Sequence, residues 1–139
     1  MTQKLTESLA IDCIVAPQDV GTADVTGSWI DVSKCKRFVL LAKAGAVTAA
    51  KILTVQPRQA KDASGTAAKD LGAPVAAAGA GGAAPADVGI EKLSADLDGA
   101  NGFTHVTAVL GIDENAKLGS AYVIRGERRY VPEPRDAQR

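Results

Sequence analysis

The chain has 139 residues, and 16 Lys plus Arg balance 16 Asp plus Glu, so its formal net charge is zero. This balance excludes the broad positive field that non-specific nucleic-acid binding requires, and we expect no nucleic-acid partner. The longest apolar stretch, around Ala73 to Ala86, is rich in Ala and Gly rather than Leu and Ile, and it is too weakly hydrophobic and too short to span a bilayer, so no membrane segment is expected.

The first seven residues are polar and carry no turn signal. They predict an N-terminal arm over residues 1–7, ahead of a single domain over residues 8–132. Such an arm either adds a strand to a neighbour's sheet edge, with Lys4 and Leu5 as contact residues, or is a frayed terminus. The start of the chain leads into no apolar signal core, so secretion is not indicated.

Short apolar or β-branched runs follow, each closed by Gly, Asp, Asn or Ser. The runs are Leu9–Val15, Ser28–Val32, Arg37–Lys43, Ile52–Gln56, Val88–Leu93, Thr104–Ile112 and Ser120–Arg125. Runs of this length between turn formers predict strands. The chain is therefore expected to be an all-β, single-domain antiparallel β-sandwich or barrel.

Within the run that begins at Ser28, period-two alternation places Trp29 on the same face as Asp31. Trp29 is either a core or edge residue, or an anchor in an interface, where Trp is enriched. Cys13 and Cys35 lie in or beside apolar runs, where a reduced Cys commonly serves as a small buried side chain. Without a CxxC or a Cys/His set, they predict no metal site.

The segment 73–87 is low in complexity and almost uncharged. Ala favours helix, but Gly79, Gly81, Gly82 and Pro85 interrupt the segment, and we predict a long flexible Ala/Gly loop. Farther on, Asp98-Gly99 and Asn101-Gly102 are turn dipeptides at which the chain reverses.

No catalytic or cofactor pattern is present. Asp96, Asp98 and Asn101 do not fit the EF-hand spacing, because Ala100, Asn101 and Thr107 fall at the positions that require a ligand, Gly and Glu. The single histidine, His105, lies in an expected strand, and no nucleophile elbow accompanies it. We expect no enzyme activity, no metal and no cofactor.

Arginines gather near the C-terminus at Arg125, Arg128, Arg129 and Arg135, diluted by acidic neighbours. They are either a solvated strand end or a contact patch for an acidic protein surface. Residues 133–139 are expected to form a C-terminal tail.

The order of these elements resembles the capsid decoration, or cement, proteins of tailed phages and prophages. The resemblance covers most of residues 28–132 and is carried by Trp29–Ser33, Arg37–Ala42, Leu53–Ala60 with Asp62–Leu71, Leu97–Val106 and Arg128–Pro132. It implies a protein made in the host cytoplasm that sits on the outer capsid surface of the virion, as a homo-oligomer, with a trimer expected. Its partner would be the major capsid protein. Separately from the resemblance, the candidate contact residues are Lys4 and Leu5 of the N-terminal arm together with Trp29, Arg128, Arg129 and Tyr130.

Two other functions remain open at this stage. A virion-surface or tail-associated β-module would bind a host glycan or receptor, although five aromatic residues in the whole chain are few for a glycan site. A head-tail connector subunit would have a similar build, because the fold alone does not separate it from a decoration protein.

Overall fold

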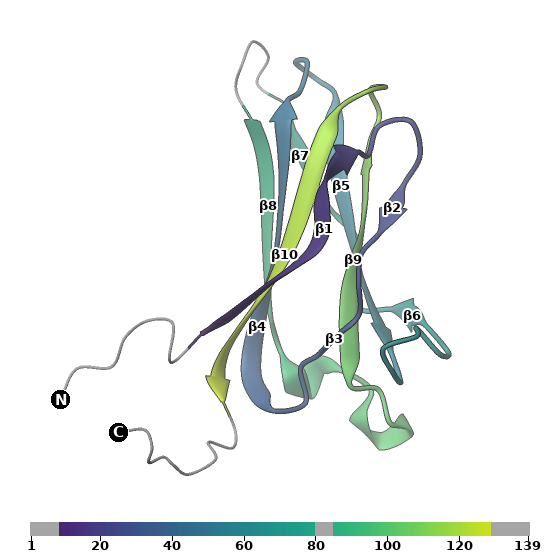
Figure 1. The fold of residues 1–139 in the computed structure, drawn as a ribbon, viewed down its shortest axis with the longest axis vertical. Coiled ribbons are helices and arrows are strands. Elements are labelled where there is room, and N and C mark those ends of the chain that lie inside the picture. Colours follow the sequence, from purple (N-terminus) through teal and green to yellow (C-terminus); the bar gives the residue numbers. More distant parts are fainter. Residues whose placement is uncertain (1–8, 80–84, 129–139) are drawn as a thin grey trace, which may run out of the picture.

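The computed structural model describes residues 9–79 and 85–128. In these residues the chain forms ten β-strands and two short 3₁₀ helices, without an α-helix (Figure 1). The strands make two antiparallel sheets that pack face to face. The predicted all-β antiparallel fold is confirmed, and its form is a β-sandwich.

The four-stranded sheet, called sheet A below, has the strand order β1-β10-β4-β8. Its strands are β1 (Ala10–Asp19), β10 (Leu118–Arg128), β4 (Cys35–Ala46) and β8 (Pro85–Leu93). The register of β1 against β10 shifts between Cys13 and Val15 and again before Gln18. Such irregularities bend an edge strand, and here they lie where β1 turns toward the other sheet.

The second sheet, called sheet B, has β9 (His105–Ile112) and β5 (Ile52–Ala60) at its centre. Short strands pair with the edge of β9 that faces away from β5 and with the edge of β5 that faces away from β9. They are β2 (Val25–Thr26) and β3 (Ile30–Asp31) on β9, and β6 (Lys69–Asp70) and β7 (Val75–Ala78) on β5. The 3₁₀ helices η1 (Ser94–Asp96) and η2 (Gly99–Asn101) connect β8 to β9.

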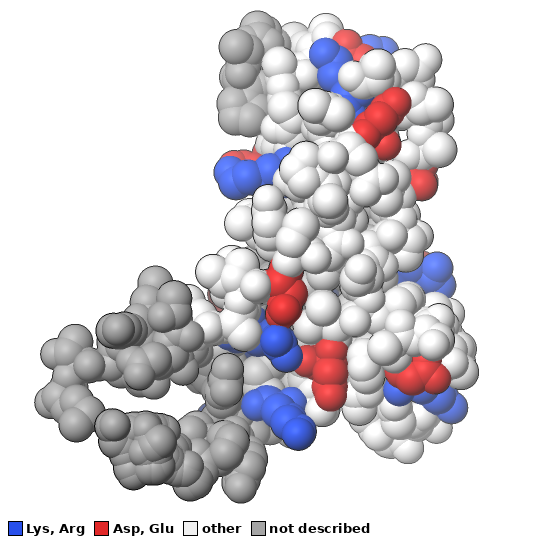
Figure 2. Space-filling model, in the orientation of Figure 1, with Lys and Arg blue, Asp and Glu red and all other residues white. Residues whose placement is uncertain are grey.

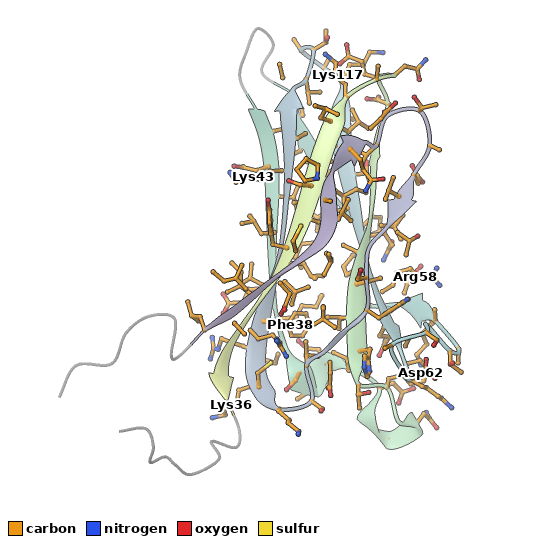
Figure 3. The ribbon with its side chains drawn as sticks, in the orientation of Figure 1. Lys36, Phe38, Lys43, Arg58, Asp62 and Lys117 are labelled. Carbon is orange, nitrogen blue, oxygen red and sulfur yellow. The ribbon has the colours of Figure 1, made fainter. Side chains whose placement is uncertain are left out.

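The core lies between the sheets and is made mainly of aliphatic side chains. Alternation along β4 turns Phe38, Leu40 and Ala42 inward, and each is about 1% exposed. Figure 3 shows Phe38 between the two layers, whereas Lys43 of the same strand points away from them. Leu53, Val55, Leu110 and Val123 are among the side chains with no exposed surface. This core fixes which face of each sheet points outward.

The loop predicted over residues 73–87 is wrong in its extent. Val75–Ala78 forms β7, which pairs with Ile52–Val55 of β5, and β8 begins at Pro85. The ladder hydrogen bonds depend on the backbone and tolerate Ala, so a sequence of low complexity can still occupy an edge strand. The rest of the predicted loop, residues 80–84, lies outside the described residues.

Two smaller expectations also need correction. The run Ser28–Val32 gives a strand of only Ile30–Asp31, so Trp29 precedes the strand. Cys13 is exposed, whereas Cys35 is buried and both are free thiols. Cys13 faces outward because it alternates with Ile14, which packs in the core.

Candidate functional site

Both described ends of the chain lie at one end of the sandwich, called the terminal end below. The antiparallel strands β1 and β10 are neighbours, with Ala10 opposite Arg125, and Arg128 is paired with Cys35 on the far side of β10 (Figure 1). Leu9 packs on this end, because a Cβ on Gly126 would lie 3.1 Å from its Cδ2 atom. Residues 1–8 and 129–139 are therefore attached to adjacent strands.

Arg125 ties this end to the other sheet. Its Nη2 atom lies 2.9 Å from Asp12 Oδ2 on β1, and its Nη1 atom donates a hydrogen bond of 3.2 Å to the carbonyl oxygen of Asp31 on β3. Both side chains of the ion pair are about one-third exposed. The network fixes the positions from which the two terminal segments leave.

Asp31 is itself held in its ionised form. Partial burial raises the pKa of Asp31, but hydrogen bonds from Ser33 and the nearby charge of His105 outweigh it, so the pKa lies below its ordinary value. The backbone N–H of Ser33 donates to Asp31 Oδ1 at 2.8 Å. Asp31 and His105 are directly opposite in the β3–β9 ladder.

Trp29 is half-buried, and its surroundings give it a packing role. A Cβ on Gly65 would lie 2.6 Å from Trp29 Nε1, so the indole is in contact with the loop between β5 and β6. Gly65 has φ of +80°, which a residue with a side chain rarely adopts. Asp62 braces this loop by accepting hydrogen bonds from Thr66 Oγ1 at 2.6 Å and from the backbone N–H of Ser64 at 2.9 Å.

The structure places two of the six contact residues expected from sequence. Trp29 lies just before β3, whose Asp31 is bonded to Arg125, and Arg128 is in the last described residue pair of β10. Both therefore belong to the terminal end. The other four lie outside the described residues: Lys4, Leu5, Arg129 and Tyr130.

A second surface, which the sequence analysis did not single out, is the outer face of sheet A. Two rows of apolar side chains cross it in register. Ile11, Ile124 and Val39 are aligned on β1, β10 and β4, and so are Cys13, Tyr122 and Leu41. These six residues are called the outer apolar face below.

This face is accessible in the single chain. Ile11 is 64% exposed, Cys13 is exposed, and the other four residues are partly exposed. Gly89 of β8 extends the second row, and a Cβ placed on it would meet nothing within 4 Å. In Figure 2 the middle of the view, over β1 and β10, carries few charged side chains, and the charges gather above and below it.

A signal for this face was present in the sequence. The run Phe38–Ala42 is apolar at every position, and so is Ala121–Ile124. An antiparallel strand with one face in water normally alternates between apolar and polar residues, whereas an unbroken apolar run is typical of a strand covered on both faces. The run thus predicts a strand that is covered on both faces.

A few features of the described residues bear on chemistry. His105 Nδ1 lies 2.8 Å from Thr104 Oγ1. Within these residues, no group of three or more His, Cys, Asp or Glu side chains is placed to hold a metal ion. A pocket between η1, η2 and the start of β9, lined by Leu97 and Phe103, has a volume of about 200 Å³. Pockets that enclose small molecules usually have roughly 300–1,000 Å³.

No family model matches the chain, and neither a curated protein nor a solved structure shows significant similarity to it. Over residues 9–79 and 85–128, no helix combines the length and the apolar character needed to cross a membrane.

Proposed function

We propose that this protein decorates the assembled capsid of a tailed phage and stabilises it by bridging major capsid subunits through the terminal end. The observation that carries the proposal is the position of the two described chain ends, which lie on the adjacent strands β1 and β10 beside the network of Arg125, Asp12 and Asp31. The resemblance of residues 28–132 to decoration proteins supports the same function.

The physical argument is multivalency. The described chain ends lie at one end of the sandwich, on the neighbouring strands β1 and β10, so the sequences that precede and follow them could each bind a different capsid subunit. Once one segment is bound, the other is held at a high effective concentration near its own site. Main-chain pairing with sheet edges would supply affinity without special side chains, which suits segments with few large apolar residues.

A glycan- or receptor-binding module is less well supported. A sugar-binding platform usually groups several open aromatic rings, but Trp29 packs on Gly65 and is half-buried, and Tyr122 is the one aromatic residue of the outer apolar face. A connector subunit at the head-tail vertex would use the same terminal end, and only the number of bound copies separates it from a decoration protein.

The test is co-sedimentation of the purified full chain with expanded capsids that have been stripped of it. We expect saturable binding, with a number of copies per shell set by the shell symmetry. A few copies at a single vertex would favour the connector, and no binding would contradict the proposal.

Matched variants locate the contact. Deleting residues 1–8, or combining Arg129→Ala with Tyr130→Ala, should weaken shell binding at least tenfold. Lys51→Ala is the control, because Lys51 follows the end of β4 that is opposite to the one paired with Arg128. If the terminal variants bind like the control, these segments are not the contact.

A further inference from the structure

We propose that the outer apolar face of sheet A binds the same face of a second copy of this chain. The proposal goes beyond capsid decoration and does not depend on it. Its basis is the aligned apolar rows across three strands, Ile11 with Ile124 and Val39, and Cys13 with Tyr122 and Leu41. Two such flat faces can pack about 10 Å apart, as the two sheets do inside a sandwich.

The charges beside this face are already paired within the chain. At the outer positions of β4 and β8, Arg37 Nη1 lies 3.1 Å from Glu91 Oε2, and Lys43 Nζ lies 3.1 Å from Asp87 Oδ2. Two cations and two anions sum to zero, so the surface offers no excess charge to a strongly acidic or basic partner. A neutral apolar surface of the same shape is the complementary partner, and a second copy provides it.

The chain's own terminal segments are poor candidates to cover the face. Residues 1–8 have Met1 and Leu5 as their large apolar residues, and residues 129–139 have Tyr130 and Val131. Both segments are otherwise polar or small. The outer apolar face has six residues. A second copy can cover them with the same six residues, whereas each terminal segment has only two large apolar residues.

The size of the face predicts a weak dimer. With the flanking Arg37–Glu91 and Lys43–Asp87 pairs included, the face spans four strands about 4.8 Å apart and six residue steps of about 3.3 Å along β4, a projected area of roughly 400 Å². A stable interface usually buries about 800 Å² on each partner. We therefore expect a dissociation constant on the order of micromolar or weaker.

Symmetry fixes the number of copies at this surface. A face that binds itself makes an isologous contact, which closes at two copies. The trimer expected from the resemblance would need a different surface. On a shell, neighbouring bound copies would have a high local concentration, which favours this weak contact.

Sedimentation equilibrium of the full chain, from roughly 1 µM to 1 mM, tests the proposal across the expected affinity range. We expect a monomer–dimer equilibrium that Leu41→Asp weakens at least tenfold, because two carboxylates would be buried at the contact. Thr54→Asp is the matched control, since Thr54 is partly exposed on the outer side of sheet B. Circular dichroism of each variant checks folding.

If Leu41→Asp does not fold, Ile11→Lys replaces it, because Ile11 lies on the edge strand β1 and is 64% exposed. A monomer at every concentration would overturn the proposal. So would an oligomer that Leu41→Asp and Ile11→Lys leave unchanged. A chain that dimerises only after residues 1–8 or 129–139 are removed would also overturn it, because its own terminal segment would then cover the face.

Discussion

The outer faces of the two sheets differ although both sheets are antiparallel and share one core. In the middle of β4 and β10 the outward positions are apolar, whereas from Thr54 to Arg58 on β5 they are polar. The residues compared are Val39, Leu41, Tyr122 and Ile124 of sheet A, and Thr54, Gln56 and Arg58 of sheet B. An antiparallel sheet needs an apolar residue only on its inner side. Sheet A therefore carries more apolar surface than this fold requires.

The polar side chains of sheet B are bonded by the chain itself. Gln56 Nε2 donates to the carbonyl oxygen of Gly72 at 3.0 Å, and Arg58 Nη2 donates to that of Ala68 at 3.2 Å. Figure 3 shows Arg58 on the side of the molecule that carries β6. The segment around β6 thus covers part of sheet B, while the described chain provides no such cover for the outer apolar face.

The largest expected effect is on the free energy of unfolding, and it differs between the inner and outer sides of β4. Leu40 of β4 is 1% exposed, and its neighbour Leu41 points outward. Leu40→Ala should destabilise the fold by about 2–5 kcal/mol, because it leaves a cavity in the core. Leu41→Ala should cost less than about 1 kcal/mol in the monomer, because water already reaches this side chain.

Urea unfolding at low protein concentration measures both values. Equal costs for Leu40→Ala and Leu41→Ala would mean that the two sides of β4 are equally covered in the monomer, and the comparison between the faces would fail.

A smaller effect on stability depends on whether there is room for a Cβ atom at Gly65 and at Gly89. Gly65→Ala should cost about 1–2 kcal/mol, because its φ of +80° disfavours a side chain and the new Cβ would collide with Trp29. Gly89→Ala, on the outer side of sheet A, meets nothing within 4 Å and should change stability by less than about 0.5 kcal/mol. Thermal unfolding of both variants checks this; a larger loss at Gly89 would show that its surroundings are filled.

Much of this architecture could be predicted from sequence. The apolar runs predict the long strands, and Asn101-Gly102 predicts the turn in which Gly102 has φ of +83°. Strand pairing could not be predicted, because alternation says which residues share a face and not which strands are neighbours. The pairing of Ala76 and Ala77 in β7 depends on backbone hydrogen bonds, which leave no side-chain pattern.

The arrangement of the terminal end could be predicted from sequence only in part. Trp29 and Arg128 lie at the same end of the molecule, where Arg125 of β10 is hydrogen-bonded to Asp31 of β3. The sequences around Arg125 and Asp31 give no signal for this long-range contact. The outer apolar face could have been predicted from the unbroken run Phe38–Ala42, since a strand covered on one side only would alternate.

The smallest expected effect is a pH dependence on the Trp29 side of the molecule. Hydrogen bonds from Thr66 hold the pKa of Asp62 below its ordinary value of 3.8. The stabilisation that Asp62 provides is therefore complete above pH 3.8 and is lost as the pH falls through the lower folded-state pKa. Fluorescence of Trp29, the single tryptophan, should report loosening of the Asp62 loop in this acid range.

Asp62→Asn is the control for that titration, because the amide does not ionise. The fluorescence change should shrink in Asp62→Asn relative to the parent chain. An identical acid transition in both proteins would assign it to other carboxyl groups.

Alkylation of Cys13 tests the central claim most directly, because this thiol lies on the outer apolar face and is exposed in the single chain. Cys35 is 3% exposed and serves as the internal control. We predict that Cys13 reacts several-fold more slowly at roughly 1 mM chain than at 1 µM, and that Leu41→Asp abolishes this difference. A Cys13 rate constant that is independent of protein concentration would contradict the account.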